Sequence, residues 1–242
     1  MNRTTLVYGL GALGLGLLGL RYFDFALQWQ PVPQGLPHRE AIAAMSALLL
    51  LLAGIAALTQ RAWAMGLLLL AALYGSWALL LHAPRVAAAP LDLSKWQGLA
   101  EITALASAAV MGLAAERGAQ RLARIAQIVF GACCLVFGAS HFVYAKFTAS
   151  FVPAWLPEPL YWAYATGAGH IAAGLSLISG VIARWGAIGA AAMYAGFVLL
   201  LHVPRVFHAP GERIEWTMLA VALSLTGAAW IVASSIRPGA RR

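Results

Sequence analysis

The sequence predicts an all-α membrane protein with eight transmembrane helices, arranged as two parallel four-helix-bundle repeats. Of its 242 residues, 62% are hydrophobic and only 10% are charged, whereas a soluble domain carries roughly 25% charged residues. Apolar runs close to the roughly 20 residues that a spanning helix needs recur along the whole chain. In addition, the second half of the chain repeats the pattern of the first. Together these observations exclude an ordinary soluble protein.

The apolar runs are separated by breaks rich in proline, glycine or charge, such as QPVPQGLPHRE, AERGAQRLAR and RVFHAPGERIE. The first run is long and is not followed by a small-x-small cleavage site, so we interpret it as a membrane helix rather than a signal peptide. We expect spanning helices at residues 5–23, 41–59, 63–82, 97–115, 125–145, 161–182, 185–202 and 216–235.

The two halves of the sequence match at one constant offset of 120 residues, without gaps from about residue 11 to residue 100. The matching stretches include LLLHAPRV at 79–86 with LLLHVPRV at 199–206, and VPQGLP at 32–37 with VPAWLP at 152–157. We therefore predict a tandem duplication, with repeats at residues 1–120 and 121–242. Because four spans return the chain to its starting side, the repeats should be parallel. A shared pocket is expected near their pseudo-two-fold axis or inside one bundle.

The net charge of +8 is interpreted as a sign of membrane topology rather than of a nucleic-acid partner. When the spans alternate, the side that holds both chain ends receives three basic clusters, in the loop 117–124 and in both tails. This bias predicts that both termini are cytoplasmic in a multi-pass protein of the bacterial inner membrane. Every acidic residue except Glu116 falls on or near the other side, as do most histidines. We therefore expect any chemistry to face outward.

Several classes of site are excluded by the motifs. Cys133 and Cys134 are adjacent in an apolar run, and no CxxC occurs, so a disulfide framework or a reactive dithiol is not expected. The GxGxxG pattern at residues 9–14 lies within a membrane span without a preceding strand, which indicates helix packing rather than a dinucleotide site. No P-loop or catalytic triad motif is present.

The repeated segments each place a histidine and an arginine at the end of an apolar run. These residues are His82 with Arg85, and His202 with Arg205. Ionisable groups inside a membrane are costly and mark functional sites by default. Pro204 disfavours helix at Val203, so we expect the span to end or kink there. Either the side chains cap a helix end and reach the headgroups, or they line a pocket that binds an anionic or quinone-like head.

Three histidines gather in the second repeat. They are His141, His170 and His202, whose counterparts in the first repeat are Arg21, Leu50 and His82. Because they lie on three different predicted helices of one bundle, any imidazole chemistry is expected in the second repeat. His170 either bonds to a neighbouring helix or contacts a ligand. A metal or haem site is a further alternative, although the spacing has no diagnostic motif and we assign no metal ligand.

Two acidic residues are candidates for proton transfer or ion pairing. Glu101 lies about five residues into the fourth predicted span, and Asp24 follows the first span. We expect Arg85 to be the countercharge of Glu101, because an isolated buried carboxylate would neutralise instead. Tryptophans and tyrosines at the outer ends of the spans, Trp29 among them, are interpreted as an interfacial aromatic belt.

Residues of the second repeat resemble those of DoxX-like membrane proteins. The resemblance rests on GASHF at 138–142, FVPAWLP at 151–157 and GHIAAGL at 169–175, and it covers most of residues 125–206. It weakens over the first repeat, where Arg21 stands in place of the histidine and the loop reads QPVPQGLPH. The resemblance implies a four-helix unit. That family includes the membrane subunit of thiosulfate:quinone oxidoreductase, and similar proteins act as membrane chaperones or cargo receptors.

Two functional hypotheses follow. In the first, the chain is a membrane component of a quinone-linked redox system, with an outer-facing pocket lined by histidine and arginine and with a redox protein as partner. Ring nitrogens and guanidinium groups can bind quinone oxygens, and a nearby acid can pass protons. In the second, the chain is a non-enzymatic membrane chaperone, assembly factor or small-solute carrier. A chaperone would bind a client protein in the bilayer. Whether the chain is an enzyme stays open.

Overall fold

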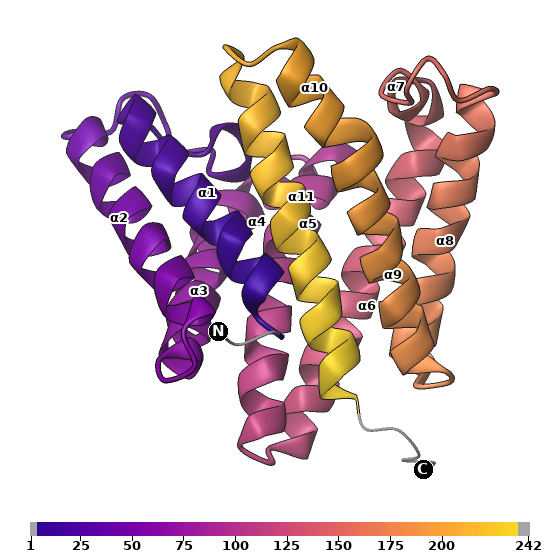
Figure 1. Cartoon of the computed structure of the whole chain (residues 1–242), viewed down its shortest axis with the longest axis horizontal. Coiled ribbons are helices and arrows are strands. Elements are labelled where there is room, and N and C mark those ends of the chain that lie inside the picture. The colour runs from indigo at the N-terminus through magenta and orange to yellow at the C-terminus, as the bar shows by residue number, and fades with distance from the viewer. Residues whose placement is uncertain (1–3, 237–242) are drawn as a thin grey trace.

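The computed structural model describes residues 4–236, and within that range the chain is built from helices without any strand (Figure 1). The predicted all-α class is therefore confirmed. The helices are α1 Leu6–Tyr22, α2 Arg39–Leu58, α3 Trp63–Trp77, α4 Ala83–Ala88, α5 Leu93–Glu116, α6 Gln120–Val143, α7 Ala145–Ala149, α8 Pro159–Ser179, α9 Ala183–Phe197, α10 Val203–His208 and α11 Arg213–Ser235. A short 3₁₀ helix spans Leu27–Trp29, and π-helical turns span Ala78–His82 and Val198–His202.

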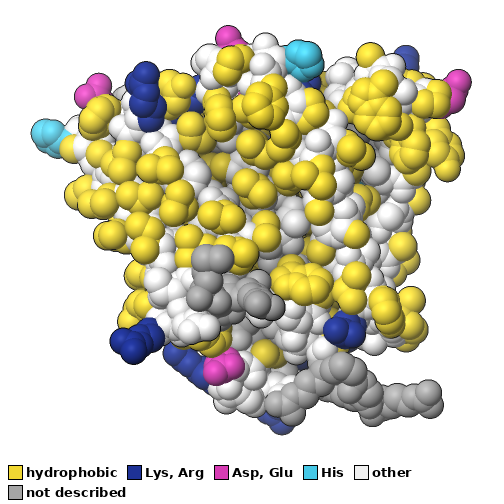
Figure 2. Space-filling view, in the orientation of Figure 1, with side chains coloured by type: hydrophobic (Ala, Val, Ile, Leu, Met, Phe, Trp, Pro, Cys, Tyr) yellow, Lys and Arg dark blue, Asp and Glu magenta, His cyan; other side chains and the backbone are white. Residues whose placement is uncertain are grey.

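The helices of a multi-pass membrane protein are present. Within the described residues, six helical stretches are long and apolar enough to cross a bilayer: α2, α3 through α4, α5, α6, α9 through α10, and α11. Of the other two expected spans, α1 has 17 residues, somewhat short of the roughly 20 needed. Helix α8 has 21 residues, but its histidine, glycines and aromatic side chains lower its hydropathy. Figure 2 shows hydrophobic side chains over the flanks of the molecule, with charged side chains gathered toward its two ends.

The helix containing Pro204 does not end before the proline. Instead α9 passes through the π turn Val198–His202 into α10, which continues to His208. Proline lacks an N–H group, and its ring clashes with the carbonyl of residue i−4 in a regular helix. A wider π turn placed just before the proline accommodates this conflict. The same arrangement occurs at Ala78–His82, so each LLLHxPRV segment is a π turn followed by a short helix.

Helices α5 and α11 lie at the centre and join the two halves of the chain. Helix α5 contacts α3, α6 and α11, while α11 also contacts α1 and α9. The crossing of α1 and α11 is close because it is made at glycines: a Cβ atom added at Gly227 would lie 2.1 Å from the backbone nitrogen of Tyr8. The Tyr8 hydroxyl donates to the Leu105 carbonyl at 2.8 Å and ties α1 to α5.

Helix α5 of the first half and four helices of the second half form a ring. Around this ring, α5 contacts α6, α6 contacts α8, α8 contacts α9, α9 contacts α11, and α11 returns to α5. Glycines again permit close approach, since a Cβ atom at Gly138 of α6 would lie 2.6 Å from the side chain of Ile171 on α8. Small residues at such crossings are typical of membrane helices. These helices line the cavity described below.

Candidate functional site

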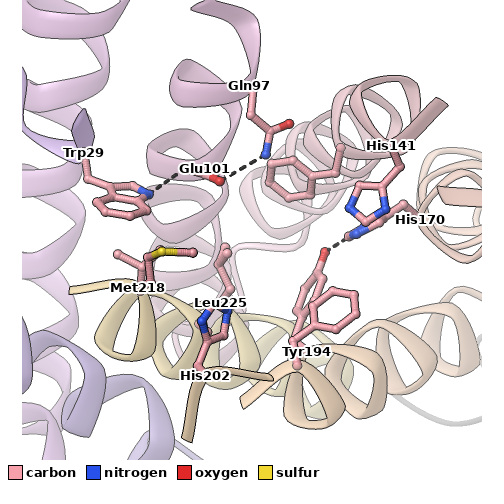
Figure 3. Close-up of a pocket in the computed structure, with 13 residues that line it drawn as sticks. Trp29, Gln97, Glu101, His141, His170, Tyr194, His202, Met218 and Leu225 are labelled. Atoms are coloured by element: carbon pink, nitrogen blue, oxygen red, sulfur yellow. Dashed lines mark hydrogen bonds between the residues drawn. The ribbon is translucent and has the colours of Figure 1, made fainter. Parts of the chain in front are cut away.

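A cavity of about 180 Å³ lies within the five-helix ring (Figure 3). Its polar lining combines residues of both halves of the chain: Gln97, Glu101, His141, His170, Tyr194 and His202. The remaining wall is apolar and contains three aromatic side chains, Trp29, Phe137 and Phe197, beside Met218, Val221, Ala222 and Leu225. The cavity is therefore shared between the two halves of the chain, because it lies between α5 of the first and the helices of the second.

Glu101 on α5 is held by two neutral donors. Its Oε2 accepts a hydrogen bond from Trp29 Nε1 at 2.6 Å, and its Oε1 accepts one from Gln97 Nε2 at 3.0 Å. The expected ion pair with Arg85 was wrong, since none of the ion pairs among residues 4–236 includes Glu101. The assignment of Trp29 to the interfacial belt was also wrong, because its side chain is buried with 5% exposure and reaches Glu101.

His141, His170 and Tyr194 form one polar wall of the cavity, with each residue on a different helix. His141 Nδ1 lies 3.0 Å from Thr166 Oγ1, and the rings of His141 and His170 are 4.9 Å apart. His170 Nδ1 lies 3.3 Å from the Tyr194 hydroxyl, which is itself 3.9 Å from Cys134 Sγ. The hydrogen bonds thus form two separate pairs, His141 with Thr166 and His170 with Tyr194, and the two pairs meet at the contact of the imidazole rings.

His202 completes the polar lining from the end of the second π turn. Its side chain is buried, and its Nδ1 has no hydrogen-bond partner among the described residues. Arg205, a turn later, is engaged elsewhere: its Nε and Nη2 donate to the two carboxylate oxygens of Glu215 at 2.8 and 2.5 Å. Arg205 therefore anchors α10 on α11 beside the cavity, while His202 faces the space itself.

The matching segment of the first half has another role. His82 Nε2 lies 3.1 Å from the carbonyl oxygen of Trp29, and His82 packs directly on Gly98 of α5, where a Cβ atom would lie 3.0 Å from its Nδ1. At the 120-residue offset, Met218 of α11 corresponds to Gly98. Arg85 is exposed. Neither His82 nor Arg85 lines the cavity, although both were candidate ligand-binding residues.

Asp24 lies outside the cavity, in an ion-pair cluster that links the two halves. It pairs with Arg39 of α2 and, at 3.2 Å, with Arg213 of α11. Arg213 also donates to the Phe25 carbonyl at 2.6 Å. Burial raises the pKa of Asp24, but hydrogen bonds from the Phe25 backbone N–H, Arg39 and Arg213 outweigh it, so the pKa lies below its ordinary value. This geometry favours the ion-pair role over proton transfer.

Replacing Asp24 by asparagine is expected to lower thermal stability at neutral pH and to reduce its acid dependence. Because the folded-state pKa is depressed, Asp24 contributes stability above its unfolded pKa of about 3.9 and loses it as pH falls through the folded value. The variant should lose roughly 1–2 kcal/mol of folding free energy. Each kcal/mol lost lowers the thermal midpoint by about 2–4 °C. Thermal unfolding in detergent from pH 7 to 3 measures this.

The control for Asp24→Asn is Glu212→Gln, which removes an exposed negative charge at the start of α11 that makes no capping bond. Its thermal midpoint, and the change of that midpoint between pH 7 and 3, should match those of the parent protein. If the thermal midpoints of Asp24→Asn and Glu212→Gln were equal at every pH, the ion pairs of Asp24 would contribute nothing to stability.

Sequence reasoning found four of the cavity residues and missed others. Glu101, His141, His170 and His202 were predicted, whereas Tyr194, Gln97 and Trp29 were not. Tyr194 carried a signal, because its counterpart Tyr74 recurs at the 120-residue offset. Within residues 4–236, no group of three or more histidine, cysteine, aspartate or glutamate side chains is placed to hold a metal ion. The three histidines therefore do not converge on one point.

Residues 130–233 match a family described as "Domain of unknown function (DUF8561)". The match covers less than half of the chain. It begins within α6 and ends within α11, so it includes every cavity-lining residue except Trp29, Gln97 and Glu101. No curated protein and no solved structure matches the chain.

Proposed function

We propose that the chain is a DoxX-like protein of the bacterial inner membrane with eight crossings, in which α1 and α8 add to the six more apolar stretches. Residues 1–120 and 121–242 would be two parallel four-helix units with both termini cytoplasmic. The element boundaries support this, because α8, α9, the second π turn, α10 and α11 each begin 120 residues after α2, α3, the first π turn, α4 and α5. The central contact of α5 with α11 suits a pseudo-two-fold axis.

We infer that the cavity binds the head of a membrane quinone as part of a quinone-linked redox system. The observation that carries this inference is a ring-sized space with aromatic walls and polar groups at its edges. An engineered cavity of about 150 Å³ takes up benzene, so 180 Å³ admits one substituted six-membered ring. Pockets for drug-sized ligands are larger, at roughly 300–1,000 Å³, so this space suits a single ring better than a larger molecule. The long tail of a quinone would remain in the lipid.

The residues around the space suit proton exchange with such a ring. When bound, a quinone supplies two oxygen atoms that take up two protons and two electrons on reduction. His202 presents a ring nitrogen that has no partner within residues 4–236, and Glu101 is a carboxyl group held by neutral donors, so each can hold or release a proton in place. The electrons would come from a separate redox protein as partner.

A second candidate function is non-enzymatic: a small-solute carrier, or a membrane chaperone or assembly factor. One observation favours it. The cavity is lined by Glu101 from the first half and by His202 from the second, so a relative motion of the halves would open and close it. Vesicle uptake of a solute would support the carrier, and co-purification of a client protein would support the chaperone.

The proposal is tested by quinone content and binding, with a matched pair of histidine variants. His202→Ala is expected to weaken binding of a short-tailed quinone about tenfold, because one hydrogen bond of roughly 1.4 kcal/mol is lost. His208→Ala removes an exposed histidine outside the cavity, at the end of α10, and should change the affinity less than twofold. The measurements are mass spectrometry of organic extracts and titration of tryptophan fluorescence in mild detergent. Absence of both co-purified and added quinone from the protein would overturn the proposal.

A further inference from the structure

Two buried polar atoms that belong to cavity-lining residues lack hydrogen-bond partners among the described residues. They are Gln97 Oε1 and His202 Nδ1. Figure 3 shows the two side chains on opposite sides of the space. Buried polar groups in folded proteins are almost always satisfied by protein or by ordered water, so each unsatisfied atom needs an explanation. A ligand that completes both bonds is one.

The orientation of the Gln97 amide follows from Glu101. An ionised carboxylate only accepts hydrogen bonds, and the indole of Trp29 only donates them. Glu101 Oε2 is taken by Trp29, and its Oε1 receives the Gln97 NH₂ group at 3.0 Å. In the structure the Gln97 amide turns its nitrogen toward Glu101, as an ionised carboxylate requires, and its oxygen has no partner among the described residues. An amide oxygen accepts and cannot donate, so this edge of the cavity requires a donor from the ligand.

The opposite edge is less restrictive. His202 Nδ1 accepts or donates according to its tautomer, so it can meet either a hydroxyl group or a carbonyl oxygen. The Tyr194 hydroxyl is already paired with His170, so it does not supply the donor that Gln97 Oε1 needs. Carbonyl oxygens at both ends of a quinone would satisfy His202 but would face Gln97 Oε1 with a second acceptor.

We propose that the cavity selects a ring with hydroxyl groups, a hydroquinone, over the corresponding quinone, with one hydroxyl donating to Gln97 Oε1 and the other meeting His202 Nδ1. This inference rests on the proposed function and names the redox state that the same site prefers. A tenfold preference for the reduced ligand would raise the midpoint potential of the bound couple by about 30 mV, because tenfold in a two-electron equilibrium corresponds to that difference.

The test is a donor series on one ring, titrated anaerobically into the purified full-length protein. The probes are hydroquinone, 4-methoxyphenol, 1,4-dimethoxybenzene and 1,4-benzoquinone, which carry two, one, no and no hydroxyl groups. Hydroquinone is expected to bind about tenfold more tightly than benzoquinone, with 4-methoxyphenol between hydroquinone and dimethoxybenzene. Gln97→Leu, which keeps the size of the side chain but removes the acceptor, should abolish the preference. His208→Ala, at an exposed position outside the cavity, should retain it.

Each outcome is decisive. Equal binding of hydroquinone and benzoquinone would overturn this inference while leaving quinone binding intact. Dimethoxybenzene binding as tightly as hydroquinone would show that water satisfies both atoms, and it would also overturn the inference. If no ring compound binds, the proposed function fails and the inference fails with it. Because the donor series is measured on the parent protein, it decides the matter even where Gln97→Leu does not fold.

Discussion

Replacing Gly227 by alanine is expected to sharply reduce the amount of folded protein recovered from membranes. The added Cβ atom would lie 2.1 Å from the backbone nitrogen of Tyr8 and 2.5 Å from its Cα. Backbone atoms cannot swing aside as a flexible side chain does, so α1 and α11 must separate. Separation would also strain the hydrogen bond from the Tyr8 hydroxyl to Leu105. Overpacking and the weakened bond together cost roughly 2–5 kcal/mol.

The measurement is the thermal midpoint in detergent together with the monodisperse yield, compared with Gly75→Ala and Gly189→Ala. At either control position, an added Cβ atom would have no described atom within 4 Å apart from its chain neighbours and the backbone of its own helix, and both glycines lie inside helices. Alanine there should be neutral or stabilising by up to about 1 kcal/mol. A Gly227→Ala protein as stable as these controls would show that α1 and α11 do not cross closely.

The helices were predictable because their signal is local. An apolar run interrupted by proline, glycine and charge determines its own length, and the 120-residue offset extended each assignment to the other half. The π turns were not predictable in form. The sequence shows that Pro204 conflicts with a regular helix, but it does not show whether the chain responds by ending the helix or by widening one turn.

The site was only partly predictable because its contacts join distant segments. His82 and His202 are alike in sequence, yet His82 packs on Gly98 and reaches the Trp29 carbonyl, whereas His202 lines the cavity. Glu101 was paired with Arg85 on charge alone, whereas its partner Trp29 lies 72 residues earlier. Neither pairing appears in the local pattern, so both required the packed structure.

The substitution Glu101→Gln is expected to invert the ligand preference of the cavity from hydroquinone to benzoquinone. Trp29 Nε1 is a pure donor, so it holds the new amide by its oxygen, and the new NH₂ group then points toward Gln97. Two NH₂ groups cannot face each other favourably. The Gln97 amide therefore turns over, offers its oxygen to residue 101, and presents its own NH₂ group to the cavity.

The change is measured with the same ring compounds, as the ratio of dissociation constants for hydroquinone and benzoquinone. The parent protein should favour hydroquinone about tenfold, and Glu101→Gln should favour benzoquinone by severalfold, a reversal worth roughly 2 kcal/mol. The double variant Gln97→Leu/Glu101→Gln completes a double-mutant cycle for these two residues. It should show no preference, because the inversion acts only through the Gln97 amide. An unchanged preference in Glu101→Gln would contradict the fixed orientation of Gln97.

The glutamine variant also stands for a protonated Glu101, since a neutral carboxyl group donates to Gln97 as an amide NH₂ group does. With Glu101 ionised, the Gln97 amide would accept a hydrogen bond from hydroquinone. With Glu101 protonated, the same amide would donate a hydrogen bond to a quinone. Proton occupancy at Glu101 and the redox state of the ligand would thus be coupled through one amide group. Because linkage is reciprocal, binding of hydroquinone should favour release of a proton from the parent protein. The Glu101→Gln variant should release none.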